Sequence, residues 1–143
     1  MKNSGFTYFE LLLVVALIAI LGALSSPFLS RSLSQNHLEE TTNKLVRSLR
    51  KGQNYSLTGK QDSAWGVHYG DEKIILFKGE FYGQDHSFDE SCQVPRTIKI
   101  TGWSDVIFSQ VRGQPSTILS LIISSNSGSR TVTLNQEGGI NVE

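Results

Sequence analysis

Cysteine and proline are scarce in this sequence. Among 143 residues there is one cysteine, Cys92, and there are three prolines. One cysteine cannot form an intrachain disulfide, so the folded part must be held by a hydrophobic core and by helix packing. We expect Cys92 to be a free thiol, either in a surface loop or against a sheet.

No excess of charge of either sign is present. The chain carries 13 basic and 13 acidic residues. This balance favours neither nucleic acid nor anionic lipid as a partner. The length allows one membrane helix and one small domain of about 90 residues. The 13 glycines, together with many serines and threonines, are typical of a turn-rich β domain.

The spacings that mark metal sites and catalytic sites are also missing. Three histidines are scattered without the spacing of a zinc site: His37, His68 and His86. Asp85, Asp89 and Glu90 match no calcium-binding pattern. Asp85-His86 lies near Cys92, but nothing in the sequence organises a Cys/His nucleophile. We find no Gly-rich phosphate loop, and we expect neither a cofactor nor an enzymatic activity.

What the sequence does contain is a long apolar run near its start. From Phe6 to Leu24 only Thr7 and Glu10 are clearly polar. As an α-helix this run would measure about 29 Å, close to the thickness of a membrane core. Lys2 precedes it, and the positive-inside bias therefore predicts a cytoplasmic N-terminus with the rest of the chain outside.

Glu10 is the exceptional residue of this run. An acidic side chain within an apolar membrane helix costs about 2.5–3.5 kcal/mol on insertion scales. Such a residue indicates a functional site and needs a partner. No basic residue lies three or four positions from Glu10. A cut after Gly5 would create one, because Phe6 would then carry a positive α-amino group.

The segment around Gly5-Phe6-Thr7 resembles the class III signal of type IV pilins and type II secretion pseudopilins. That pattern is a short basic leader ending in Gly, then Phe-Thr-x-x-Glu and a long apolar run. The resemblance implies that a prepilin peptidase cuts between Gly5 and Phe6 and that Phe6 becomes N-methylated. It also implies that Glu10 neutralises the Phe6 amine, in its own or a neighbouring subunit, during filament assembly.

The apolar helix is interrupted and then continues as an amphipathic one. Gly22 and Pro27 weaken helical hydrogen bonding, and we expect a bend near Pro27. Leucines then recur at helical spacing, and we expect the helix to end at about Tyr55 or Leu57, before Gly59. This stripe could pack on the chain's own β domain or on other helices in a filament.

The remainder predicts short strands. We expect a hairpin from 64–69 and 73–78 around Gly70-Asp71-Glu72, and a polar surface loop over Gly79–Val94. Further strands are expected at 97–101, 106–111, 117–124, 130–134 and 140–142.

The predicted fold class is α+β: a long N-terminal helix, with a membrane half and an amphipathic half, packed on an antiparallel β-sheet domain as in a pilin. Its expected parts are a leader (1–5), a transmembrane or filament-core helix (6–26), an amphipathic helix (27–58) and a β-sheet head domain (59–143).

The C-terminal part is loosely similar to the pseudopilin H and FimT-type minor pilin domain. Phe108-Ser109 and Gly113 fit its Phe-Ser-x-x-Gly element approximately. The last segment, 137–143, lacks the basic Gly-Arg ending of that domain.

The sequence as a whole predicts a structural subunit, a minor pilin or pseudopilin, first in the cytoplasmic membrane and then in a filament. Its expected partners are the prepilin peptidase, other pilin subunits and membrane lipid. Two alternatives stay open. An ordinary signal peptide cut after Ser25 would give a secreted binding module. A DNA-uptake pilin could use Arg47, Arg50 and Lys51 on phosphates, although nucleic acid is not the expected partner.

Overall fold

The structure is a computed structural model of the chain. It describes residues 7–143, and within its first helix the side chains of residues 24–29 are not described. The chain divides into two compact units, Met1–Leu33 and Ser34–Glu143. Each unit is described by itself.

Helix α1 (Tyr8–Leu57) contributes residues to both units. It ends where the sequence predicts: Thr58 still donates a backbone hydrogen bond to Asn54, and Gly59 then adopts a left-handed conformation, with φ 62°. A left-handed residue just after a helix is a common terminator, and glycine adopts it without strain. The predicted end near Leu57 is therefore confirmed.

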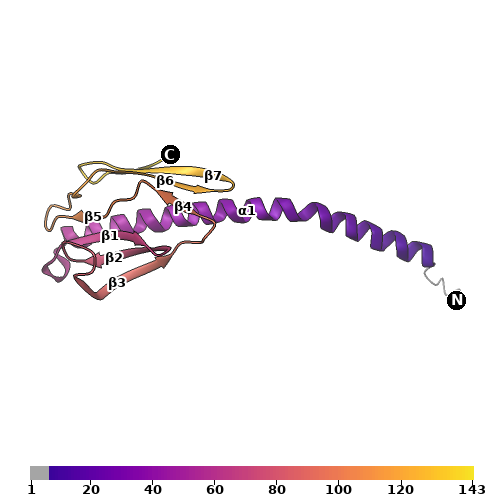
Figure 1. Ribbon diagram of the computed structural model, residues 1–143, viewed down its shortest axis with the longest axis horizontal. Helices are drawn as coiled ribbons and strands as arrows, with labels where there is room; N and C mark the ends of the chain where they lie inside the picture. The colour runs from indigo at the N-terminus through magenta and orange to yellow at the C-terminus, as the bar shows by residue number, and fades with distance from the viewer. Residues whose placement is uncertain (1–6) are drawn as a thin grey trace. The chain divides into compact units, whose positions relative to one another are not determined.

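After α1 the described residues form one short 3-10 helix and eight strands; Figure 1 labels α1 and the strands β1 to β7. They are η1 (Lys60–Asp62), β1 (Trp65–Gly70), β2 (Lys73–Lys78), β3 (Asp85–Gln93), β4 (Lys99–Thr101), β5 (Val106–Phe108), β6 (Leu119–Ser125), β7 (Gly128–Leu134) and β8 (Ile140–Val142).

The first antiparallel sheet has the strand order β3-β2-β1-β5. Its β1–β2 hairpin is the predicted one, with Gly70 paired to Lys73. Asp71 and Glu72 in the turn have φ values of 51° and 57°. Two consecutive positive φ values are the mark of the tight turn that matches the twist of a hairpin.

The second antiparallel sheet has the order β4-β6-β7-β8. Strand β6 alternates cleanly: Leu119, Leu121 and Ile123 are buried, whereas Ser120 and Ile122 are exposed. This period of two packs one face on the core and leaves the other in solvent. The strands expected at 117–124 and 130–134 are confirmed with shifted ends, and the one expected at 140–142 is β8.

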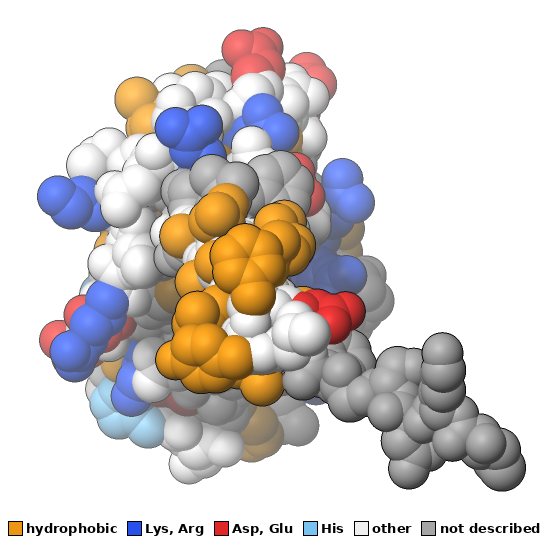
Figure 2. Space-filling view, turned by 90° about the vertical axis from the view of Figure 1, so that its right-hand side faces the viewer, with side chains coloured by type: hydrophobic (Ala, Val, Ile, Leu, Met, Phe, Trp, Pro, Cys, Tyr) orange, Lys and Arg blue, Asp and Glu red, His pale blue; other side chains and the backbone are white. Residues whose placement is uncertain are grey.

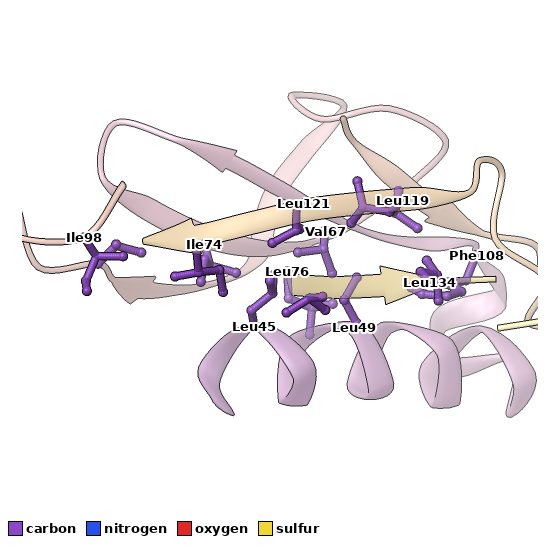
Figure 3. Close-up of a cluster of buried hydrophobic side chains, with 14 of the residues drawn as sticks. Leu45, Leu49, Val67, Ile74, Leu76, Ile98, Phe108, Leu119, Leu121 and Leu134 are labelled. Atoms are coloured by element: carbon purple, nitrogen blue, oxygen red, sulfur yellow. The ribbon is translucent and has the colours of Figure 1, made fainter. Parts of the chain in front are cut away.

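One hydrophobic core joins α1 to both sheets in the second unit. Leu45 and Leu49 of α1 are fully buried and point toward strand residues such as Leu76 and Leu121 (Figure 3). Trp65 is also buried, and its indole N–H donates to the carbonyl of Lys60. The leucine stripe of this part of α1 therefore serves the chain's own core.

The predicted fold class is wrong. The strands form two four-stranded sheets, not one. Helix α1 does not pack on a sheet over its whole length, because its residues belong to two compact units. Among its described residues, those that enter the core lie in the second unit, from Leu38 onward. The physical reason for two sheets is non-sequential pairing: β5 pairs with β1, and β4 pairs with β6.

Among the residues whose structure is described, we find no helix with the length and hydrophobicity that crossing a membrane requires.

The loop predicted over Gly79–Val94 is also wrong, because most of it forms strand β3. The strand pairs with β2 through contacts such as Ile74 with Cys92, and the register shifts between Leu76 and Lys78. At the edge of a sheet a strand needs few apolar residues, so polar composition did not reveal it.

Candidate functional site

Thr7 caps the start of α1. The backbone N–H of Glu10 donates a hydrogen bond to the Thr7 hydroxyl at 3.3 Å, and Leu11 N–H donates to the Thr7 carbonyl at 3.1 Å. This is the geometry of an N-cap, in which a short polar side chain accepts from the first free N–H groups of a helix. Glu10 consequently lies in the first turn, where a negative charge is favourable.

The predicted partner of Glu10 cannot be placed, because the expected cleavage and methylation site, Gly5-Phe6, lies outside the described residues. The side chain of Glu10 is exposed, and its carboxylate forms no ion pair within residues 7–143.

An apolar surface follows Glu10 along α1. Every residue from Thr7 to Ala23 is exposed, and the large hydrophobic side chains are between 43% (Val14) and 79% (Tyr8) exposed. Hydrophobic side chains reach the surface as a group in Figure 2. Contiguous exposed apolar surface of this kind marks contact with another protein or with lipid.

Of the two predicted helix-breaking residues, the structure describes Gly22 fully but not the side chain of Pro27. Gly22 lies within α1, and a side chain at this position would meet no other atom within 4 Å. The side chain of Pro27 lies outside the described set, as does the bend expected beside it.

Cys92 is a free, half-buried thiol in β3, on the strand paired with Ile74 of β2. Of the two expected places for this thiol, a surface loop or the sheet, the structure shows the sheet. A groove of about 380 Å³ brings it near Lys44, Arg47 and Lys51 of α1.

Of the three basic residues considered for DNA contact, Lys51 already has an ion-pair partner. Lys51 forms an ion pair with Glu90, and this hydrogen bond raises the pKa of Lys51. Arg47 and Arg50 are exposed and have no hydrogen-bond or ion-pair partner among the described residues.

The histidines each have separate partners. His37 contacts Thr97, at 3.3 Å between Nδ1 and the hydroxyl oxygen. The other two lie beside carboxylates: His68 Nδ1 is 2.8 Å from Asp105, and His86 Nδ1 is 2.7 Å from Asp89. Within the described part of the chain no three His, Cys, Asp or Glu residues gather as metal ligands would.

One feature was missed by sequence reasoning. A groove of about 600 Å³ opens in the second unit between the turn after α1, the loop 79–84, and the segment 107–116. Its polar residues come from separate parts of the chain, and no spacing in the sequence links them. Only the folded structure brings them together.

Comparisons with protein-family models, with curated proteins and with solved structures found no match to this chain.

Proposed function

We propose that this chain is a structural subunit, a minor pilin or pseudopilin, of a type IV pilus or type II secretion filament. It is held in the cytoplasmic membrane by its apolar N-terminal segment, cut after Gly5 and methylated at Phe6 by a prepilin peptidase, and then packed into a filament with other subunits. The proposal rests on the sequence signal around Glu10 and not on the fold class, which differs from the expected one.

In the structure, the exposure of the apolar stretch supports the proposal. From Tyr8 to Leu21 the large hydrophobic side chains are 43–79% exposed. Exposing so many apolar groups to water is costly, at about 25 cal/mol per Å². Lipid before assembly, and neighbouring helices after it, would cover them.

Glu10 gives this packing its specificity in the proposed mechanism. An unpaired carboxylate in an apolar helix bundle would be strongly destabilising, and pairing with a positive amine offsets part of that cost. Each incoming subunit would thus have to place Glu10 beside a Phe6 amine. The requirement sets the axial register between neighbouring helices, as single buried polar residues do in coiled coils.

The second unit would then be the part displayed outside the membrane. Its core is complete in itself, since Leu45, Leu49 and strands of both sheets bury one another. A head with its own core can keep its structure while the apolar helix exchanges lipid for protein neighbours.

A fractionation experiment tests the proposal. The chain is expressed in its native host, surface filaments are sheared off, and membrane and filament fractions are probed by immunoblotting. We expect processed chain in both fractions. A variant with Gly5→Leu should keep its leader and remain in the membrane, because the peptidase must accept a small residue at the cut. A chain found only as a soluble secreted protein would reject the proposal and support the ordinary signal-peptide alternative.

A further inference from the structure

The 600 Å³ groove of the second unit is lined largely by polar residues. Its volume lies within the range of small-molecule sites, roughly 300–1,000 Å³. The segments that form it can be followed in Figure 1 after α1, between β2 and β3, and between β5 and β6. Six of its lining residues are amides or hydroxyls: Ser63, Gln84, Ser109, Gln110, Gln114 and Ser116.

Two of the hydroxyl groups are oriented by the backbone. Ser109 Oγ accepts a hydrogen bond from the Gln114 N–H, and Ser116 Oγ accepts one from the Ile107 N–H, each at 3.1 Å. A hydroxyl that accepts in this way keeps its own hydrogen for donation. Both serines can therefore donate to a ligand.

The amide groups supply both kinds of hydrogen-bonding atom. Gln110 Nε2 donates to Asp62 Oδ1 at 2.7 Å, which leaves Gln110 Oε1 as an acceptor. Gln84 Oε1 accepts from the Glu80 N–H at 2.9 Å, which leaves Gln84 Nε2 as a donor. Donors and acceptors are thus mixed along the groove.

The charges of the groove exclude other ligand classes. No lysine, arginine or histidine lines it, so it offers no positive charge to an anion. Of its two carboxylates, Asp62 accepts a hydrogen bond from the Gln110 side chain, whereas Glu80 has no side-chain partner among the described residues. Two exposed carboxylates, one of which already accepts a hydrogen bond, are a weak basis for binding a cation. A neutral ligand rich in hydroxyl groups matches the lining best, since each hydroxyl both donates and accepts.

The walls of the groove are fixed by contacts outside it. In the loop 79–84, Tyr82 stacks on His68 with ring centroids 3.9 Å apart and planes 4° apart. The Val111 N–H donates to the carbonyl of Ser56 in α1 at 2.9 Å, which ties the opposite wall to the helix. Walls that are already ordered reduce the entropic cost of binding.

We propose that this groove binds a neutral oligosaccharide, through Gln84, Gln114 and the serine hydroxyls. The inference is independent of the filament function: it concerns the second unit alone and would hold for a secreted binding module as well.

A glycan array tests this directly. The full chain, purified in detergent micelles, is applied to an array of neutral, sialylated and sulfated oligosaccharides, and the neutral oligosaccharide that gives the strongest signal is titrated by calorimetry. The variant is Gln84→Ala combined with Gln114→Ala. The matched control is Gln136→Ala, since Gln136 is an exposed glutamine outside the groove. Gln114→Ala alone serves if the double variant unfolds, because the hydrogen bonds of Gln114 use only its backbone.

We expect binding to neutral oligosaccharides that weakens about tenfold or more in the groove variant, as loss of two hydrogen bonds implies, and is unchanged in Gln136→Ala. An array without a neutral ligand, or binding that the groove variants leave unaltered, would overturn the proposal. Tri-lysine and tri-glutamate are added as competitors. Displacement of the glycan by tri-lysine, abolished by Glu80→Gln, would show instead that the groove takes a cation.

Discussion

The backbone N–H of Glu10 donates to the hydroxyl of Thr7, and this contact separates two roles of the Glu10 position. The first role is local: Thr7 caps α1 and Glu10 occupies its first turn. The second belongs to the carboxylate charge, which has no ion-pair partner within residues 7–143. Glutamine is accepted in this turn of a capped helix nearly as well as glutamate, so the two roles can be tested apart.

Replacing Glu10 with glutamine should block assembly and little else. The substitution keeps the side-chain size and the capped helix start, but removes the charge proposed to pair with the Phe6 amine. Leader cleavage and folding of the second unit should be normal, while the filament fraction falls sharply relative to the membrane fraction. Immunoblots of the two fractions measure this.

The control for that experiment is Glu39→Gln, which removes an exposed charge of α1 that lies in the second unit. It should assemble like the unaltered chain. If Glu10→Gln also assembles normally after correct cleavage, Glu10 has no part in assembly.

Thr7→Ala should shorten or fray the start of α1. The hydroxyl that accepts from Glu10 N–H is lost, at a cost of about 0.5–2 kcal/mol. Circular dichroism of the full chain in detergent should show reduced helix content, and Thr7→Ser, which keeps the hydroxyl, should restore it. Equal helicity in all three proteins would mean that the cap is unimportant.

Leu45→Ala should destabilise the second unit by about 2–5 kcal/mol, because Leu45 is fully buried between α1 and the sheets. Urea unfolding followed by the fluorescence of buried Trp65 gives the free energy of unfolding. Leu33→Ala is the control, since Leu33 is 50% exposed and should change stability by less than about 0.5 kcal/mol. Similar losses in both variants would contradict the described core.

Asp85 should contribute stability that depends on pH. The Ser87 N–H donates to its carboxylate at 3.0 Å, and this hydrogen bond, aided by Lys78, lowers the pKa of Asp85. A lowered pKa favours the folded state above the unfolded value of about 3.9, and the gain is lost as pH falls through the folded value.

Asp85→Asn should therefore be less stable than the unaltered chain at pH 7, and the two urea midpoints should converge below about pH 3.9. Glu137→Gln removes the same charge at an exposed site without a side-chain hydrogen bond, and should show no such convergence. A constant difference for Asp85→Asn from pH 7 to pH 3 would refute the pKa shift.

Local patterns predicted much of the second unit. The Gly70-Asp71-Glu72 turn, the end of α1 before Gly59 and the apolar strand β6 all lie close to where the sequence predicts them. Each depends on neighbours within a few residues, so that the sequence carries the signal directly. The burial of Leu45 and Leu49 follows from the same kind of spacing.

Long-range pairing could not be predicted in this way. Strand β4 joins β6 through pairs such as Ile100 with Ile123, across an intervening strand that belongs to the other sheet. Strand β3 was hidden by its polar composition at a sheet edge. The 600 Å³ groove combines Asp62, Gln84 and Gln114, residues whose proximity depends on the whole fold.

Whether this chain is a processed filament subunit can be read from the intact mass of the chain recovered from sheared filaments. We expect a polypeptide that begins at Phe6 and carries one added methyl group, since the signal resembles a prepilin cleavage site at Gly5-Phe6. A mass that retains residues 1–5, or that corresponds to cleavage after Ser25, would contradict it.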